Sequence, residues 1–288
     1  MDGFVATWGL ETVRTAVRLS AIFVIMALLE RLFAKERQSA LSRVKALVFW
    51  SLSVPIIAGV STAMVMFWKA AHLPSLHVPM WFQSTHPLVS GVGYLAAPIL
   101  GAIVGDFFFY WMHRAQHAFF WRFHSIHHSI REMNGIASYH HLSEELFRGA
   151  MIYIPTLFLI PDVGTVAPWL AVMIALQGFY LHSCTRLHLG PLVRIIGDNR
   201  FHRIHHSLEP RHFDKNFSGF SPIWDMLFGT AYFPEADEWP ATGLADAPEP
   251  ELISDYLARP FRRQQAAVSN NVIAPIAPAT AGSVRHST

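Results

Sequence analysis

The sequence predicts an all-α integral-membrane protein, in which about four spanning helices and one short re-entrant segment support a histidine-rich helical cap on the cytoplasmic side. Three observations lead to this fold class. The 288-residue chain is 52% hydrophobic and only 15% charged, whereas soluble domains carry about 25% charge. Several apolar runs reach the roughly 20 residues that a spanning helix needs. Thirteen of the 17 histidines lie between His113 and His212.

The remaining totals exclude several classes of protein. A net charge of +2 gives no reason to expect a nucleic-acid partner. Cys184 is the only cysteine, which excludes an intramolecular disulfide and cysteine-rich zinc or iron–sulfur sites. The short apolar run Ala21–Leu29 is followed by Glu30 and by no small-residue cleavage site. We therefore expect it to belong to a retained first helix and not to a signal peptide.

Four apolar segments predict the spanning helices: Thr15–Phe33, Ala46–Trp68, Leu88–Met112 and Val163–Leu181. The second has 23 residues and no charge, and the third has a single acidic residue, Asp106, near its end. The run Gly149–Pro161 has only thirteen residues, which is too short to cross alone. We expect it to dip into the membrane and to form a hairpin with the fourth segment, broken at Pro161-Asp162.

Lysine and arginine bias orients these segments. The first connection is basic, with Arg31, Lys35, Arg37, Arg43 and Lys45. The next connection, Ala70–Pro87, has no lysine or arginine and should face outward. Counting forward places every histidine cluster on the cytoplasmic side. The chain has no lysine-rich retrieval tail, which favours a bacterial inner membrane over the endoplasmic reticulum.

We expect one membrane domain over residues 1–261 and a disordered tail over 262–288, because the tail is rich in Ala, Pro, Ser and Val without periodicity.

Three histidine motifs dominate the middle of the chain. "HRAQH" holds His113 and His117, "FHSIHHS" holds His124, His127 and His128, and "FHRIHHS" holds His202, His205 and His206. On a helix, residues three and four apart share a face, so each motif directs its imidazoles together. Neutral imidazole binds iron, zinc or copper. Eight such ligands exceed the four of a tetrahedral zinc site, so the number favours two metal ions.

In this ordered set, and in the closing "WDMLFGT", the sequence resembles the fatty acid hydroxylase / sterol desaturase superfamily of membrane-bound, histidine-rich diiron enzymes. The resemblance runs from about Asp106 to about Gly229, and it implies a catalytic region at about 100–232. It implies O2, two iron ions and an external electron donor, with which such enzymes hydroxylate or desaturate lipids. Zinc can replace the iron on purification, since imidazole sites accept it readily.

The resemblance implies that the histidines of the three motifs are metal ligands and adds two more. His141 precedes x-x-Glu144 as the family pattern requires, and it is favoured over His140. His182 follows the last apolar segment. Some hydroxylases have another histidine four residues later, where this chain has Arg186. The exact coordination number therefore stays open, as does any part played by His140, His188 or His212.

Three carboxylates are candidates to orient the ligands through the second ring nitrogen of an imidazole. They are Asp106, Glu144 and Asp225. Asp106 lies within a predicted span, where ionisable residues are commonly functional, although an interfacial carboxylate is an equal alternative.

Unactivated C–H bonds are not broken by side-chain acid–base chemistry, so the metal ions must supply the oxidising power. The sequence has no dinucleotide fingerprint and no haem-attachment motif, which indicates a separate reductase. A metal-binding protein or transporter is the main alternative. However, a transporter should place polar ligands inside its spans, and Ala46–Trp68 has none. A haem electron carrier and an inactive homologue with structural zinc are further alternatives. The lipid, and the choice between hydroxylation and desaturation, stay open.

Overall fold

The computed structural model describes residues 2–75, 85–159 and 168–262. Every regular element in this described part is helical, and its β-structure consists of isolated bridges such as that between Ala34 and Thr185. The predicted all-α class is therefore confirmed. The expected break at Pro161-Asp162 lies outside the described residues, and so does the expected disordered tail over 262–288 apart from Arg262.

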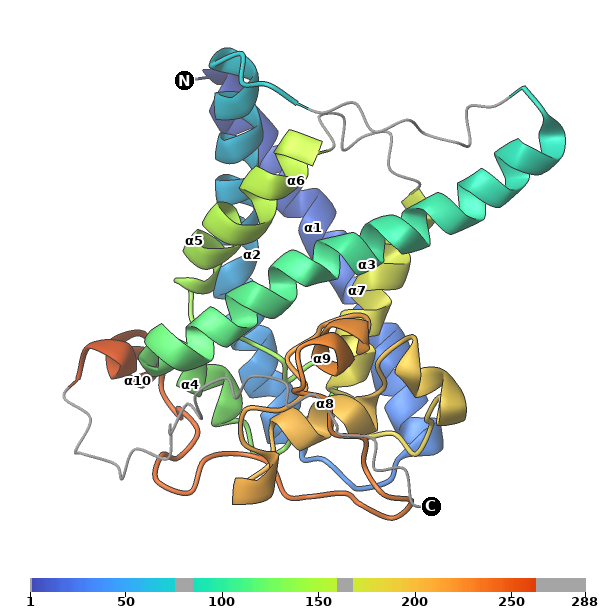
Figure 1. Cartoon of the computed structure of the whole chain (residues 1–288). Coiled ribbons are helices and arrows are strands. Elements are labelled where there is room, and N and C mark those ends of the chain that lie inside the picture. The colour runs from blue at the N-terminus through green and yellow to red at the C-terminus, as the bar shows by residue number, and fades with distance from the viewer. Residues whose placement is uncertain (1, 76–84, 160–167, 263–288) are drawn as a thin grey trace, which may run out of the picture.

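Two long helices, α1 (Asp2–Phe33) and α2 (Ala40–Ala70), pack against each other and are joined by a short turn (Figure 1). The Ser39 side chain caps α2 by accepting the Ser42 N–H at 3.1 Å. At the other end of the pair, the Trp8 indole donates to the Pro55 carbonyl at 2.7 Å. Pro55 cannot donate a helical hydrogen bond, and this contact fastens α1 to α2 near that interruption.

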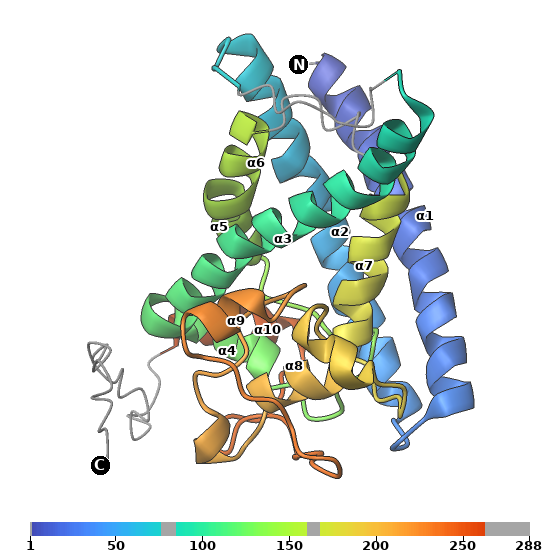
Figure 2. The ribbon, with the colours of Figure 1, turned by 45° about the vertical axis from the view of Figure 1, so that its right-hand side comes forward.

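A third long helix, α3 (Pro87–Phe119), crosses the others obliquely and ends beside the histidine-rich half of the molecule (Figures 1 and 2). Within the described residues, α2 and α3 are long and apolar enough to cross a membrane, and Val172–Leu181 is a shorter apolar helix. These are two candidate spans where the sequence predicts about four. The N-terminal part of α3 carries mostly apolar residues, and its last two turns carry His113 and His117.

The remaining helices are short. After α3 come α4 (Trp121–His128), α5 (Glu144–Arg148), the π-helical η2 (Gly149–Tyr153), α6 (Ile154–Leu159) and α7 (Pro168–Leu181). They are followed by η4 (Gly190–Arg194), α8 (Asn199–His205), η5 (Pro210–His212), α9 (Ile223–Leu227), α10 (Ile253–Ala258) and η6 (Arg259–Phe261). The α5–η2–α6 segment runs alongside α2 (Figure 1). In the same view, α4, α8 and α9 lie below α3.

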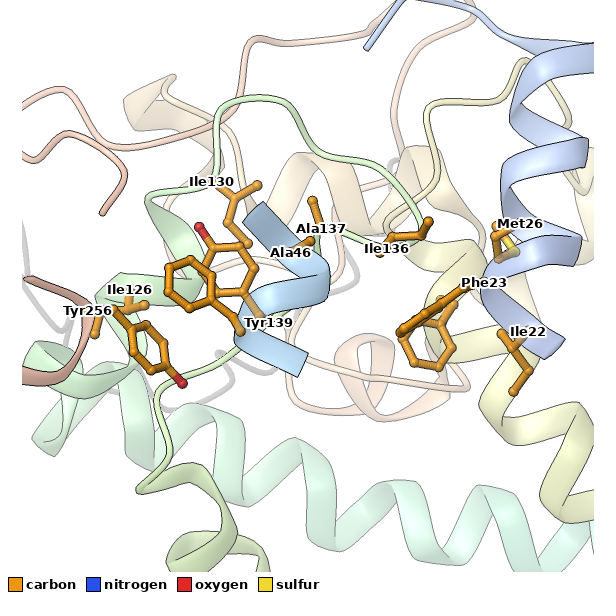
Figure 3. Packing of buried hydrophobic residues seen from close by; sticks show 12 residues of the cluster. Ile22, Phe23, Met26, Ala46, Ile126, Ile130, Ile136, Ala137, Tyr139 and Tyr256 are labelled. Atoms are coloured by element: carbon orange, nitrogen blue, oxygen red, sulfur yellow. The ribbon is translucent and has the colours of Figure 1, made fainter. Parts of the chain in front are cut away.

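An apolar core joins the long helices to the histidine-rich half (Figure 3). The Phe49 ring of α2 lies 4.4 Å from both Tyr139 and Tyr256, measured between ring centroids. On the other side of the cluster, Met26 of α1 packs on the loop at Gly135. A Cβ there would lie 2.8 Å from the Met26 Cε and 3.1 Å from its Cβ, so a larger residue would require Met26 to shift. The core thereby holds the loop that leads to Tyr139.

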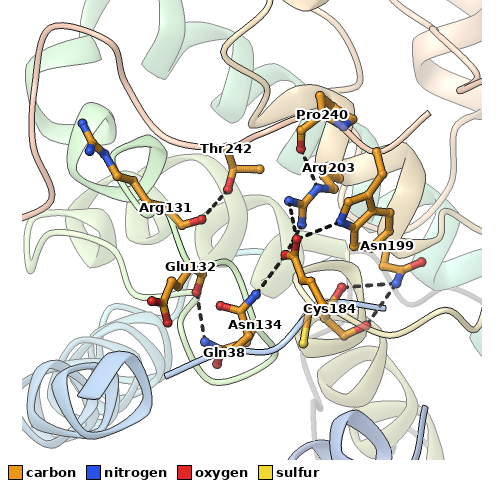
Figure 4. Close-up of polar contacts among 12 residues, drawn as sticks. Gln38, Arg131, Glu132, Asn134, Cys184, Asn199, Arg203, Pro240 and Thr242 are labelled. Atoms are coloured by element: carbon orange, nitrogen blue, oxygen red, sulfur yellow. Dashed lines mark hydrogen bonds and ion pairs between the residues drawn. The ribbon is translucent and has the colours of Figure 1, made fainter. Parts of the chain in front are cut away.

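A buried polar network fastens the same loop and α8 to the α1–α2 turn (Figure 4). Arg203 of the third histidine motif contacts none of the ligand histidines through these bonds. Its guanidinium contacts Glu36 at 2.9 Å and the Pro240 carbonyl at 2.7 Å. Asn199 donates to the Thr185 carbonyl at 2.7 Å. The arginine between the histidines of "HRIHH" is thus a structural anchor.

Candidate metal centre

Nine histidines among the described residues converge in two groups whose ligand atoms lie within 4.8 Å of one another. We call them group one, with His113, His117, His124, His128 and His205, and group two, with His127, His182, His202 and His206. The groups adjoin, because the His128 and His206 rings stack with centroids 4.4 Å apart. All eight motif histidines and His182 therefore lie together in these two groups.

Helical spacing explains how the ligands are divided. His124 and His128 of α4 are one turn apart and both belong to group one, whereas His127 belongs to group two. The α8 motif is arranged the other way: His202 and His206 belong to group two and His205 to group one. Residues four apart share a helix face while an adjacent residue faces elsewhere. Each HxxHH motif thus contributes to both groups.

The ring nitrogens lie at the distances expected of ligands around a common ion. In group one, the Nε2 atoms of His113 and His124 are 2.9 Å apart. In group two, the Nε2 of His182 lies 3.2 Å from that of His127 and 3.0 Å from that of His202. Two nitrogens bound at right angles to one ion, each at roughly 2.1 Å, lie about 3.0 Å apart. The residues therefore fit a pair of metal ions.

Backbone carbonyls hold the opposite ring nitrogen of some of these ligands, whereas the Nδ1 atoms of His124, His202 and His206 are buried without a hydrogen-bond partner. In group two, His127 Nδ1 lies 3.1 Å from the Tyr139 carbonyl and His182 Nδ1 lies 2.9 Å from the Gly178 carbonyl. A carbonyl can only accept, so each Nδ1 carries the proton and each Nε2 presents its lone pair. The Nε2 atom of His205 is likewise buried and has no hydrogen-bond partner, so its lone pair is free. This is the tautomer that metal binding through Nε2 requires.

Burial keeps these imidazoles neutral. Desolvation lowers the pKa of His124, His127 and His128 well below the usual value, and the neighbouring imidazoles lower it further. The pKa values of His202, His205 and His206 fall for the same reasons. A neutral imidazole is the form that binds a metal, so ligands need not lose a proton near pH 7.

Asp106 and Asp225 contact the loop that follows Asn216. The Asp106 carboxylate accepts backbone N–H groups from Gly219 at 2.8 Å and Ser221 at 2.7 Å. Asp225 accepts the N–H groups of Phe217 at 2.8 Å and Ser218 at 2.9 Å. The sequence suggested direct bonds from these carboxylates to imidazoles. In the structure, the backbone of this loop lies between the two carboxylates and the imidazoles. The path of the loop places it there, and the spacing of the residues in the sequence does not predict that path.

Glu144 lies closer to the ligands. It forms a group with His124 and His140, and its Oε1 is buried without a hydrogen-bond partner. Its other oxygen accepts from the Gln116 amide at 2.5 Å. Burial raises the pKa of Glu144 to about 7. Of the three carboxylates, it is the one whose oxygen lies within 4.8 Å of histidine ligand atoms.

The structure brings His140, not the favoured His141, to the centre. The His140 ring stacks on His127 with centroids 3.7 Å apart. His141 forms no part of the ligand groups in the described residues: its Nδ1 pairs with the Ser143 hydroxyl at 2.8 Å and its ring packs against Tyr256. Tyr139 packs on Tyr256 as well, so the residue between them faces the other way. In an extended segment, alternate side chains face opposite sides. The aromatic residue at 139 was therefore the sequence signal that 139 and 141 face the core and 140 faces the histidines.

Two other histidines lie apart from the centre. His188 is exposed, and its Nδ1 accepts the Gly190 N–H at 3.2 Å. His212 is buried, but its nitrogens pair with the Ser207 hydroxyl at 2.8 Å and Glu238 at 3.1 Å. Both nitrogens of His212 are therefore already engaged away from the two groups.

The region that contains the two histidine groups is similar in sequence to known proteins. The model of the fatty acid hydroxylase family matches residues 98–230. The ornithine lipid hydroxylase OlsE of Rhizobium tropici is 27% identical over 255 residues, which cover 87% of this chain and 74% of that protein. The alkylglycerol monooxygenase of Danio rerio is 33% identical over 135 residues, covering 46% of this chain and 30% of that protein.

A putative methylsterol monooxygenase of Dictyostelium discoideum is 31% identical over 134 residues, which cover 45% of this chain and 48% of that protein. The chain thus matches about three quarters of the bacterial relative but less than half of these two eukaryotic relatives. No solved structure matches the chain. The matched region contains both HxxHH motifs and their two ligand groups, so residues 98–230 match a fatty acid hydroxylase domain, and the relatives above belong to the same superfamily.

Proposed function

We propose that this protein is an O2-dependent membrane oxygenase that hydroxylates a lipid at two iron ions held by groups one and two. The convergence of nine imidazoles, eight of them buried and His117 half-buried, in two adjacent groups supports this proposal above all else. Hydroxylation is favoured over desaturation because several relatives are named hydroxylases or monooxygenases. We propose a lipid of the kind those names cover, with an acyl, alkyl or sterol hydrocarbon part.

Iron bound in these groups would supply the O2 activation that an unreactive C–H bond requires. The protein's own residues supply the rest. Carbonyls at Tyr139 and Gly178 hold ligand protons on Nδ1 and so aim each Nε2 inward. Ile126 and Ile204, which stand next to ligand histidines in the two HxxHH motifs, are fully buried and add apolar surface that disfavours water. Exclusion of water protects an oxidising site from side reactions.

We propose that α1 and the hairpin containing α7 cross the membrane together with α2 and α3, which gives the four spans expected from the sequence. Exposed apolar side chains along α1 support this, since Val13 and Val17 are 61% and 64% exposed. The basic turn between α1 and α2 supports a cytoplasmic position for the histidine-rich half. A lipid would then reach the metals sideways from the bilayer, while a separate reductase delivers electrons from the cytoplasm. The membrane in this proposal is a bacterial inner membrane.

Comparative lipidomics tests the function. Cells with the intact chain should contain a lipid with one added oxygen, and this lipid should be missing from cells without the gene and from cells with His127→Ala. A product with two hydrogens fewer would show that the reaction is desaturation and not hydroxylation. An unchanged lipid profile together with altered cellular metal content would favour the alternative, a metal-binding protein or transporter.

Metal analysis tests the cofactor. Protein purified without oxygen should bind about two iron ions per chain, because the ligands form two groups. Bound iron that His127→Ala leaves unchanged would contradict the assignment of group two.

A further inference from the structure

A four-residue segment faces group one and supplies acceptors to three of its five histidines. The Asp214 carboxylate lies 3.4 Å from His117 Nδ1. The Lys215 carbonyl lies 2.7 Å from His205 Nδ1, and the Phe217 carbonyl lies 2.7 Å from His113 Nδ1. We call Asp214–Phe217 the acceptor segment. Three acceptors within one four-residue stretch of chain thus hold three rings.

The acceptor segment has an uncommon backbone conformation. Asp214 and Asn216 both adopt the left-handed region, with φ of 57° and 59°, which asparagine and aspartate tolerate better than most residues. Asn216 holds the shape: its amide donates to the carbonyls of Phe201 at 2.7 Å and Tyr232 at 2.8 Å, and its oxygen accepts the Tyr232 N–H at 2.7 Å. The turn is thereby clamped between α8 and the chain that follows α9.

Further bonds fasten the segment at its C-terminal end. Asp225 accepts the Phe217 N–H, and Asp106 holds the next residues from α3. Asp106 lies on the same helix as His113 and His117. The acceptor segment is therefore fixed to α3 and α8, the two helices that supply three of the five ligands of group one.

Group two has different supports. His127 is held by the carbonyl of Tyr139, in the loop after α4, and His182 by the carbonyl of Gly178, within α7 itself. These supports rest on the apolar core around Phe49 and on helix α7. The two groups touch and share ligands from the same two motifs, yet the acceptors that hold their Nδ1 atoms lie on separate parts of the chain.

We propose that the acceptor segment orients the ligands of group one and so controls the affinity of the first metal position independently of the second. The residues Asp214 and Asn216 are positioning residues in this proposal, which rests on the metal centre proposed above. The chain thus has two metal positions that can be emptied one at a time.

The test measures ferrous iron bound per chain in anaerobic titrations of the full-length protein in detergent. Asn216→Gly removes the three clamping bonds and keeps the left-handed conformation accessible. We expect it to weaken one of the two iron affinities roughly 10- to 100-fold, the usual effect of losing the outer partners of metal ligands. The matched control is Asn134→Ala, another buried asparagine, whose bonds go to Ser42 and its own loop. It should keep the iron affinity of group one, and a loss at group two alone agrees with the proposal, because the loop of Asn134 leads to Tyr139, which holds His127.

Double variants identify which position is affected. His202→Ala disables group two and His113→Ala disables group one. Asn216→Gly combined with His202→Ala should bind almost no iron, whereas Asn216→Gly combined with His113→Ala should still bind about one ion. The reverse pattern, or equal loss in both pairs, would overturn the proposal.

A milder pair of variants covers the case in which Asn216→Gly fails to fold. Asp214→Gly removes the acceptor for His117 and should weaken the same iron position, while Asp214→Asn keeps an oxygen acceptor and should restore it. Unchanged iron binding in Asp214→Gly and Asn216→Gly refutes the acceptor segment even if the wild type binds two ions. A wild type that binds no iron refutes the metal centre itself.

Discussion

The helical half of the molecule, formed by α1, α2 and the first part of α3, is constructed in the opposite way from the histidine-rich half. In the helical half, large apolar side chains face outward, as Val17 and Leu32 do with 64% and 65% exposure. In the histidine-rich half, polar groups are buried, and Asn199, Asn216 and Asp225 have no measurable exposure. A soluble domain usually shows neither feature.

The difference shows which interactions stabilise each half. Outward apolar side chains lose little when the surrounding medium is a bilayer, and the backbone of a helix satisfies its own hydrogen bonds there. Buried polar groups are stable only when each is paired or ligated. The helical half is therefore suited to a lipid environment, and the histidine-rich half depends on hydrogen-bond partners and, in the proposed centre, on metal.

The largest expected effect comes from removing a ligand. His127→Ala should lower the affinity for the ion of group two by more than 100-fold, which exceeds the effect of losing an outer partner, and should abolish lipid oxidation. Iron analysis and product detection measure this. The control His188→Ala changes an exposed histidine apart from the centre and should retain both. Full iron binding in His127→Ala would break the comparison, because the buried imidazoles would then not be ligands.

Acid should destabilise the metal-free protein next most strongly. Burial lowers the pKa of His124, His202 and His206 in the folded chain, so below about pH 6.5 the unfolded chain binds protons that the folded chain does not. Stability is then present above pH 6.5 and is lost as pH falls, by about 1.4 kcal/mol per pH unit for each such histidine. Thermal unfolding of chelator-treated protein from pH 8 to pH 5 checks this. A midpoint that stays constant over that range would show that these rings are not buried neutral.

Truncating the core between the halves should have an intermediate effect. Phe49→Ala removes a buried ring that contacts Tyr139 and Tyr256, and such truncations cost about 3–5 kcal/mol. Denaturant unfolding measures the loss. Iron binding should fall at group two before group one, since Tyr139 supports His127. Equal loss at both groups would show that the core supports them jointly.

The smallest effect is expected on the outward face of α1. Val17→Thr replaces one exposed methyl by a hydroxyl of similar shape, and in detergent its effect on the free energy of unfolding should stay within about 0.5 kcal/mol. Val54→Thr is the matched change at a buried position of α2 and should cost about 1–3 kcal/mol. Equal costs at the two positions would remove the distinction between a lipid-facing and an interior side of the helices.

Much of the centre was predictable because its ligands come from helical repeats. The spacings in "HRAQH" and in the two HxxHH motifs already require shared faces, and the structure brings all eight of these histidines together. The choice between His140 and His141 was not predictable in this way. Neither residue lies in a helix, and the packing of Tyr139 and His141 on Tyr256 decides which ring points inward.

The sequence by itself determined the helical class, the apolar segments and the types of ligand, because periodicity and composition act over a few turns of chain. Only the tertiary structure decided how the histidines divide into two groups and which segments orient them. Asp214 lies 97 residues after His117 in the chain, and no local pattern links them. The packing of α8 and its following loop against α3 brings them together, so the supports of the first metal position follow from the fold.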